Sequence, residues 1–324
     1  MIRGLMVALI NEHAPELFST VRADGSQFKC SDSFVRSYLR NIGWSKRQAT
    51  KAAQKLPENH EEILTKAFLH EAYIIRDHAI PAALRVNTDQ TQLICQQGTK
   101  TTWNEKGAKQ VATVGQEEKC AFTLVPSIAA DGTLLLMQAI YTGQSSRSLP
   151  TPSSPGYNDA INFGFCMQPS LTSTYWSTHE TMHDLVDNII APYFDRTKEE
   201  LGLPPSQCSI WKIDCWSAHK SDEFLTWMKK NHESIIIIFV PGGCTGVWQP
   251  LDVGIQQLLK LSLKRSAHRD VVKEESDQIS AREDIKLDTT IGTLRNRSVG
   301  WIANAMMDIN DKDLVKKVCF TLIP

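Results

Sequence analysis

The pattern of hydrophobic and polar positions between Cys208 and Lys264 predicts two buried strands that alternate with two helices. A short apolar run over 210–213 stops at Asp214, and the continuous branched run Ile235–Val240 is typical of a strand buried on both faces. Apolar residues at helical spacing follow each strand. The stretch therefore predicts a β-α-β unit with parallel strands.

Two residues that often begin helices indicate where the helices of this β-α-β unit start. Ser221 is a candidate N-cap after the first strand, and Pro250 suits the first turn of a helix after the second strand. Loops at the carboxyl ends of parallel strands form sites, so Asp214 and Asp252 are expected to point into one. A lone aspartate at such a position is more often a helix cap or turn residue, and that alternative stays open here.

Residues 1–78 carry helical patterns alone. Ser31 or Asp32 caps one short helix that ends near Gly43, and Ser45 begins a basic, alanine-containing helix. Two short helices joined by a tight glycine turn predict a helix-turn-helix, whose second helix would enter the DNA major groove. We therefore expect a small helical domain over 1–78 and a main domain over 79–324.

The main domain is predicted to be a mixed α/β structure. A strand ends at Asp89, two strands over 120–129 and 133–141 join at an Asp-Gly hairpin, and a helix covers 179–200. The charged segment from Lys273 to Asp288 is expected to be a loop. This order of elements matches a ribonuclease-H-like mixed sheet flanked by helices. In that fold the strands that precede Asp89 and Asp214 are parallel neighbours, about 4.8 Å apart.

Charge is unevenly distributed along the chain. The 324 residues carry a formal net charge of −1, yet the stretch Gly25–Leu56 holds seven basic residues and one acidic residue, a net charge of +6. A basic stretch in a near-neutral chain predicts a polyanion-binding face, and a solvated helix surface is the open alternative. The candidate nucleic-acid-binding residues are Arg36, Arg40, Lys46, Arg47, Lys51 and Lys55.

Other bulk features exclude several classes of protein. No apolar run approaches the ~18 residues of a transmembrane helix, so no membrane partner is expected. The first residues lack the pattern of a signal peptide. The eight cysteines form no C-x-x-C pair, which favours reduced thiols inside a cell over a zinc site or a disulfide framework.

Five motifs in order carry a family resemblance. They are NTDQT at 87–91, GTKTTW at 98–103, the run from KQVATVG to GQSSRSLP, IDCWSAHKSDEF at 213–224 and PGGCTGVWQPLDVGI at 241–255. Together they resemble the DDE-superfamily endonuclease domain of pogo-type, mariner-like transposases, over residues from about 31 to 318. The N-terminal part is similar to the second half of a centromere-protein-B-like DNA-binding region and is expected to be incomplete.

The resemblance implies a transposon-derived, Mg²⁺- or Mn²⁺-dependent enzyme that cuts and joins DNA strands in the nucleus. Its three catalytic, metal-binding carboxylates map onto Asp89, Asp214 and Asp252. Magnesium ions prefer oxygen ligands, and two ions can activate the attacking oxygen and stabilise the leaving one. The implied partner is double-stranded DNA, and a homodimer is an open alternative.

Two further residues are candidates beside the carboxylates. His219 could contact a phosphate or support the metal site, or it could be a structural turn residue. Gln249 could orient the Asp252 carboxylate. A function of a different class also stays open: a domesticated nucleic-acid-binding protein that keeps the fold without catalytic activity.

Overall fold

The computed structural model describes residues 2–21, 25–48, 56–94, 101–105, 121–216, 219–282 and 287–321. Contacts divide the chain into a smaller unit, Met1–Ala53 with Gln97–Glu117, and a larger unit, Gln54–Gln96 with Glu118–Pro324. Helix α4 (His60–Asp77) therefore groups with the larger unit, whereas the sequence predicted a boundary at residue 78. The physical reason is packing, because α4 places its apolar residues against the larger unit's core clusters.

The described residues of the smaller unit form helices α1 (Ile2–His13), α2 (Glu16–Ser19) and α3 (Asp32–Asn41), of which α3 is the helix predicted after Ser31. Ser31 caps α3 as predicted, since its hydroxyl accepts a hydrogen bond of 3.2 Å from the Phe34 amide. Val35 and Leu39, one turn apart on α3, are buried and form the centre of a small apolar cluster with Cys30.

The helix predicted to begin at Ser45 is wrong. Residues Trp44–Gln48 form strand β1, which pairs antiparallel with β4 (Thr101–Glu105). Helix propensity is a weak prior, and the hydrogen bonds of a ladder with a distant segment override it here. Lys46 and Arg47 therefore lie on a strand, and Lys51 and Lys55 lie outside the described residues.

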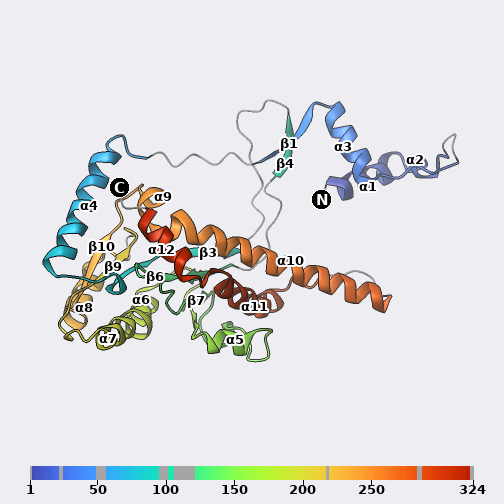
Figure 1. Ribbon diagram of the computed structural model, residues 1–324. Helices are drawn as coiled ribbons and strands as arrows, with labels where there is room; N and C mark the ends of the chain where they lie inside the picture. The colour runs from blue at the N-terminus through green and yellow to red at the C-terminus, as the bar shows by residue number, and fades with distance from the viewer. Residues whose placement is uncertain are drawn as a thin grey trace. The chain divides into compact units, whose positions relative to one another are not determined.

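In its described residues, the larger unit contains eight strands in two hydrogen-bonded sheets. Figure 1 shows where these strands lie. One sheet has the order β10 (Ile235–Phe239), β9 (Ser209–Ile213), β2 (Arg85–Thr88) and β6 (Ser127–Ala129). The other has the order β3 (Thr91–Ile94), β5 (Ala121–Val125), β7 (Gln138–Tyr141) and β8 (Cys166–Pro169).

Two pairs of consecutive strands connect these sheets. Asp89 and Gln90 separate β2 from β3, and Pro126, which cannot donate to a ladder, separates β5 from β6. Strands β9 and β10 are parallel to β2, whereas β6 is antiparallel to it and β5 is antiparallel to β7. Strand β2 is thus flanked by the antiparallel strand β6 on one side and by the parallel strands β9 and β10 on the other. This is the ribonuclease-H-like arrangement predicted from the sequence.

The predicted reversal at Asp131-Gly132 is confirmed. The Asp131 carboxylate accepts a hydrogen bond of 2.9 Å from the Thr133 amide, and Ile128 and Leu134 form an antiparallel bridge across the turn. Gly132 has φ +97°, and a Cβ at this position would lie 2.4 Å from the Lys312 carbonyl oxygen. Glycine is therefore required by both the backbone angle and the close approach.

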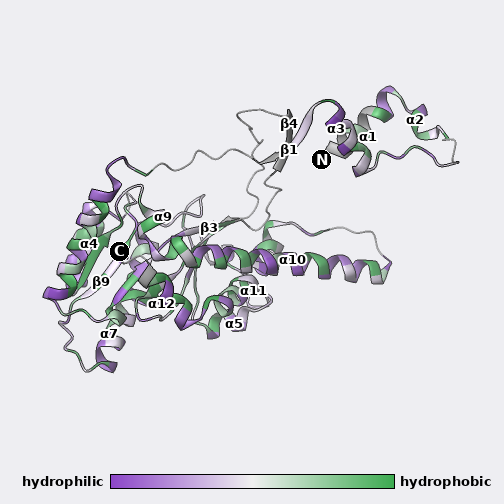
Figure 2. Cartoon of the chain, turned by 45° about the horizontal axis from the view of Figure 1, so that its top comes forward, coloured by the Kyte–Doolittle hydropathy of each residue, from purple (hydrophilic) through white to green (hydrophobic). Residues whose placement is uncertain are grey.

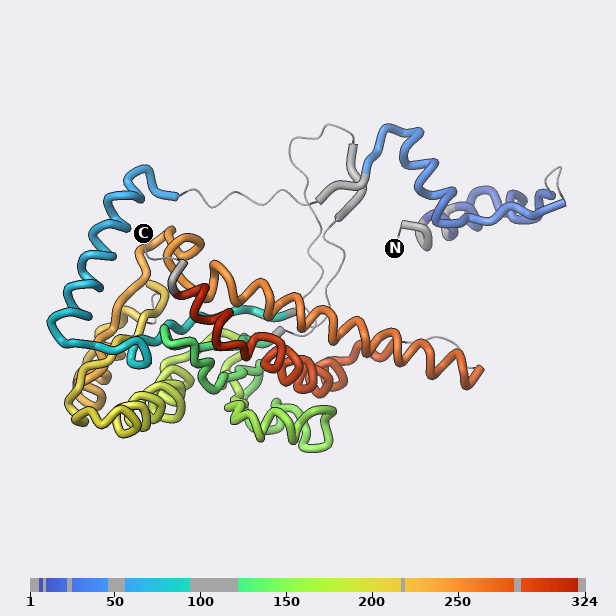
Figure 3. Tube along the Cα trace, viewed as in Figure 1, coloured from blue at the N-terminus to red at the C-terminus, as the bar shows by residue number. Residues whose placement is uncertain are grey.

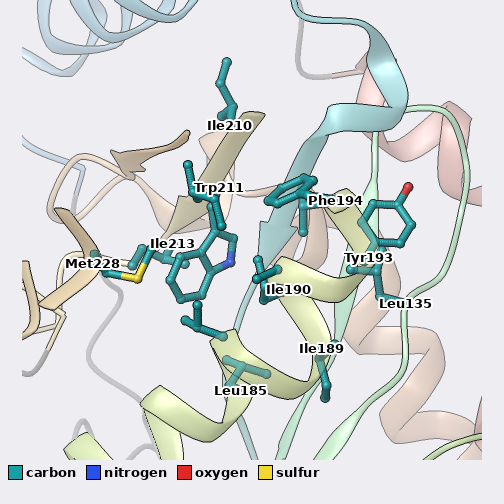
Figure 4. Packing of buried hydrophobic residues seen from close by; sticks show 14 of the residues in the cluster. Leu135, Leu185, Ile189, Ile190, Tyr193, Phe194, Ile210, Trp211, Ile213 and Met228 are labelled. Carbon is teal, nitrogen blue, oxygen red and sulfur yellow. The ribbon is translucent and has the colours of Figure 1, made fainter. Parts of the chain in front are cut away.

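One hydrophobic cluster packs around Trp211 of β9, which is fully buried (Figure 4). The indole points toward Leu185 and Ile190, and its Nε1 donates a hydrogen bond of 2.8 Å to the Thr88 hydroxyl. The helical elements of this region are α6 (His179–Leu185), a π-helical turn (Val186–Ile190), α7 (Ala191–Glu200) and α8 (Asp222–Asn231). Ser221 caps α8 as predicted, accepting from the Phe224 amide at 3.2 Å.

A second cluster packs strands β5 and β7 against helices near the C-terminal end of the chain. Helices α10 and α11 run side by side (Figure 3), and hydrophilic positions recur along α10 (Figure 2). Helix α10 continues to Ala281, so the loop predicted after Lys273 is wrong for these residues. Glu274 in this segment forms an ion pair of 2.9 Å with Arg297 of α11, which supports the helix here. The elements here are α5 (Tyr157–Asn162), α9 (Thr245–Trp248), a π-helical turn (Leu251–Ile255), α10 (Gln256–Ala281), α11 (Ile291–Ile309) and α12 (Lys312–Thr321).

Two short 3-10 helices, Ala82–Leu84 and Ser146–Ser148, complete the described elements. Across the part of the chain that the structure describes, none of the helices combines the length and apolar character needed to span a bilayer.

Candidate active site

Asp89 and Asp214 lie at the same edge of the sheet. Strands β2 and β9 are parallel, and Asn87 is the register partner of Lys212. Each aspartate is two residues beyond this pair, directly after the last residue of its strand. Parallel neighbours are about 4.8 Å apart, so the register brings the two backbones together at the carboxyl ends of the strands.

Asp252 joins Asp89 from the π-helical turn Leu251–Ile255. The two carboxyl groups lie close enough that each affects the protonation of the other. Burial, followed by the negative charge of Asp252, raises the pKa of Asp89 well above its usual value. Burial also raises the pKa of Asp252, and the charge of Asp214 adds to this effect. The pair therefore holds a proton to a higher pH than a free aspartate would.

Polar neighbours hold the Asp89 carboxylate in place. One oxygen, Oδ1, accepts a hydrogen bond of 2.8 Å from the Gln90 amide, and the Gln256 side-chain amide donates to the other, Oδ2. Lys260 in turn donates to Gln256 Oε1 at 2.9 Å. The Asp214 carboxylate accepts a hydrogen bond of 2.6 Å from the Cys215 amide.

The three carboxylates do not close into one cluster of ligands. Within the described ranges, no group of three or more His, Cys, Asp or Glu side chains is arranged to hold a metal ion. Asp89 and Asp252 form the close pair, and Asp214 acts on both through its charge. The arrangement concentrates negative charge in a partly buried place at the carboxyl ends of β2 and β9.

Asn87 is a residue that sequence analysis missed as a part of this site. Its side chain is buried, with Nδ2 donating to the Lys212 carbonyl at 3.1 Å and Oδ1 accepting from the Leu251 amide at 3.2 Å. These contacts lie two residues before Asp214 and one before Asp252. Asn87 thus connects all three segments that carry the aspartates. Its place in the NTDQT motif was the available signal.

His219 is a structural support of the Asp214 segment. Its Nδ1 lies 2.8 Å from the Asp214 carbonyl oxygen, so this nitrogen must carry the proton, and Nε2 accepts from the Gln90 side-chain amide at 3.3 Å. Burial lowers the pKa of His219. Both ring nitrogens are occupied by protein groups in this arrangement, which favours the structural alternative over phosphate contact.

Gln249 braces the end of β2. It is fully buried, and its Nε2 donates to the Thr88 carbonyl at 3.4 Å, one residue before Asp89. The hydrogen bond ties the segment that precedes Asp252 to the strand that precedes Asp89. Orientation of the Asp252 carboxylate itself by Gln249 stays a prediction.

The basic candidates lie elsewhere in the chain. Arg36 and Arg40 are exposed one turn apart on α3 of the smaller unit, and Val35 and Leu39, each one residue earlier, bury a neighbouring face of that helix. Their assignment to nucleic-acid binding stays a prediction, as does that of Lys46 and Arg47 on β1.

Comparisons with known proteins identify the family. The model of the DDE superfamily endonuclease family matches residues 119–316, a range that includes Asp214 and Asp252 and begins after Asp89. A human protein named "Pogo transposable element with KRAB domain" is 26% identical over 239 residues, which cover 73% of this chain and 36% of that protein. The chain thus spans about a third of that relative's length.

Two solved structures are similar at a coarse level. The mariner Mos1 paired-end complex with Mg has a TM-score of 0.43 and 10% identity, covering 99% of this chain and 75% of that one. A pre-cleavage Mos1 transpososome has a TM-score of 0.41 and 10% identity, covering 96% of this chain and 78% of that one. The family match alone covers more than half of the residues, and the chain therefore belongs to the DDE superfamily of endonucleases.

Proposed function

We propose that the larger unit is a divalent-metal-dependent DNA endonuclease of the transposase type, which cuts and joins DNA strands. Asp89, Asp214 and Asp252 would hold Mg²⁺ or Mn²⁺ at the carboxyl ends of β2 and β9. The observation that carries this proposal is the partly buried Asp89–Asp252 pair: burial and the charge of Asp252 raise the pKa of Asp89, and burial and the charge of Asp214 raise the pKa of Asp252. Perturbed carboxyl groups at strand ends are typical of functional sites in α/β proteins.

The residues fit a hard divalent cation. Magnesium needs only one or two carboxylates per ion and keeps several waters, so the Asp89–Asp252 pair with Asp214 nearby is a sufficient donor set. A bound metal pair would lower the pKa of an attacking water or hydroxyl and neutralise the charge on the leaving oxygen. Because a ligand carboxylate must be deprotonated, the proton that Asp89 shares with Asp252 would be released on binding.

The chain's own residues would pre-organise this site. Asn87 fixes the spacing of the three carboxylate segments, Gln249 braces β2, and His219 holds the Asp214 backbone. Each contact is made by a buried side chain, which limits motion of the ligands. Positioning within a fraction of an ångström is what such a site requires, because small displacements cost rate steeply.

Nicking of supercoiled plasmid DNA tests the proposal without knowledge of a cognate sequence. We expect open-circular product with Mg²⁺ or Mn²⁺ and none with EDTA. Nicking that persists in EDTA, or no nicking with either metal at any pH between 6 and 9, would contradict the proposed metal-dependent activity.

We further propose that the smaller unit binds double-stranded DNA through α3. Arg36 and Arg40 are spaced to face one side of the helix in solvent, where they can neutralise phosphates. The named human relative is a transposable-element protein, which supports a chain that acts on DNA in the nucleus and derives from a transposon.

Replacing Arg36 and Arg40 together with alanine should weaken DNA binding about equally for all sequences. Each phosphate contact contributes roughly 0.9 to the slope of log K against log salt, so the slope should fall by about 2. Affinity measured by fluorescence anisotropy between about 50 and 200 mM salt gives this slope. The matched control is the double change to lysine, which keeps both charges and should keep the slope. An unchanged slope in the alanine variant would make this face a solvated helix surface.

A further inference from the structure

We propose that Trp176 is a stacking site for one unpaired nucleobase beside the candidate active site; the inference rests on the proposed action on DNA. Trp176 lines a cavity of about 150 Å³ that Asp89 and Asp214 also line. Its side chain is 48% exposed, although large aromatic side chains usually bury most of their surface. A half-exposed indole therefore lines the same cavity as two of the carboxylates.

The segment that carries Trp176 is fixed to the sheet on both sides. The Tyr175 carbonyl accepts a hydrogen bond of 2.7 Å from the Thr123 hydroxyl, and the Gln92 side chain donates to the Tyr175 hydroxyl. Ser177 donates to the Gln90 side chain at 2.8 Å. The Tyr175 and Trp176 rings are 5.2 Å apart at a tilt of 38°. A half-exposed indole is thus held in position before any ligand arrives, which lowers the entropy cost of binding.

The chemistry of the cavity favours a neutral planar ring. Met182 and Ile213 give it apolar walls, while Asp89 and Asp214 disfavour an anion. Drug-sized ligands occupy roughly 300–1,000 Å³, so a cavity of 150 Å³ suits one ring system and not a whole nucleotide cofactor. A nucleobase is neutral and planar, and its phosphate would stay outside, toward the place where the carboxylates hold metal.

The hydrogen bonds of Gln90 indicate that this side chain does not recognise the edge of a base. Its Oε1 is engaged by Ser177 and its Nε2 by His219, so the amide is committed to the protein. Recognition would therefore depend on stacking, which tolerates every base because each has a π face. A paired base inside a duplex cannot present that face, so the site would take a base from a frayed end, a displaced strand or a flipped position.

The test compares DNA forms in an Asp214→Asn background, where cutting does not complicate binding. Trp176→Ala should weaken binding of a short single-stranded oligonucleotide by roughly 5- to 150-fold, the effect of losing one stacked base, and change blunt duplex binding less than about twofold. Trp176→Phe should keep most of the affinity. Tyr73→Ala, an exposed aromatic on α4 that does not line the cavity, is the matched control and should change nothing. A 2-aminopurine base in the oligonucleotide should lose fluorescence on binding the parent, and lose much less with Trp176→Ala.

Equal single-strand affinity and equal quenching in the parent and Trp176→Ala would overturn the inference. So would an equal loss for single-stranded and blunt duplex DNA, since that indicates a general structural role, and melting curves of each variant check the fold. Nicking by the wild-type protein is scored separately. Absence of nicking would contradict the proposed endonuclease activity. The stacking proposal is decided by the binding data alone.

Discussion

Asp214→Asn is expected to reduce the rate of metal-dependent DNA nicking by roughly 10³-fold or more. The change keeps the size of the side chain but replaces an anionic oxygen with an NH₂ donor, which cannot ligate Mg²⁺. Metal placement activates the attacking oxygen and stabilises the leaving one, and several kcal/mol of transition-state stabilisation correspond to this factor. The remaining oxygen can still accept the 2.6 Å hydrogen bond from the Cys215 amide, so the fold should be retained.

The measurement is the initial rate of plasmid nicking in Mg²⁺, with DNA affinity measured beside it. DNA affinity should change less than about twofold, because α3 in the smaller unit is the proposed binding surface. Asp277→Asn, the same chemical change at an exposed position on α10, is the matched control and should nick at the wild-type rate. Equal nicking by Asp214→Asn and wild type would show that another site or a contaminant cuts the DNA. No nicking by either, with DNA binding kept, would favour the domesticated binding protein.

Local patterns predicted the core of the larger unit well, because its signals are short-range. Asp214 stops an apolar run, and Ser221 precedes a helical pattern, so the strand end and the helix start could be read directly. The parallel pairing of β2 with β9 followed from the order of elements, which matches that of the ribonuclease-H-like fold. The strand end, the helix start and the strand pairing together predict, from the sequence alone, that Asp89 and Asp214 lie near each other.

Long-range pairing explains the main failure. The basic segment after Gly43 has good helix formers and no strand pattern, yet Trp44–Gln48 pairs with Thr101–Glu105, more than 50 residues away. No local rule contains that partner. The interaction also separates Lys46 and Arg47 from the helix that carries Arg36 and Arg40, so the expected recognition helix is not where the charge pattern placed it.

The supporting residues of the site were missed for a different reason. Asn87 lies in a strand and Trp176 in a Ser/Thr-rich loop, and both act through neighbours far away in sequence. A buried asparagine beside an aspartate and a large aromatic in a polar loop are weak signals alone. They become informative only when the topology shows which backbone groups and which cavity they meet.

Mg²⁺ or Mn²⁺ is expected to raise the melting temperature of the protein, and Asp252→Asn is expected to remove most of this gain. At a metal concentration of about 100 times Kd, binding to the folded state alone stabilises by roughly 2.7 kcal/mol, or about 5–10 °C for a unit of this size. Without metal, Asp252→Asn should itself stabilise the protein slightly at neutral pH, because it removes a half-buried carboxyl group whose pKa is raised by burial and by the charge of Asp214. Differential scanning fluorimetry with and without metal measures both effects, and Asp277→Asn is again the control.

The direction of each pKa shift predicts how the stability of the protein changes with pH. The folded state raises the pKa of both Asp89 and Asp252, so their contribution to stability is fully present below the unfolded value near ~4 and is lost as pH rises through the folded pKa. Burial lowers the pKa of His219, so its contribution has the opposite sign and is lost as pH falls through its folded pKa. His219 is common to both proteins, so the difference between wild type and Asp252→Asn isolates the carboxyl pair. In the absence of metal, the difference in stability between Asp252→Asn and wild type should grow from pH 4 to pH 8. The rise in the wild-type melting temperature on adding metal should grow over the same range, because the proton shared by the pair must leave before the metal binds. A metal response that is equal in the two proteins, or independent of pH, would place the cation away from Asp89 and Asp252.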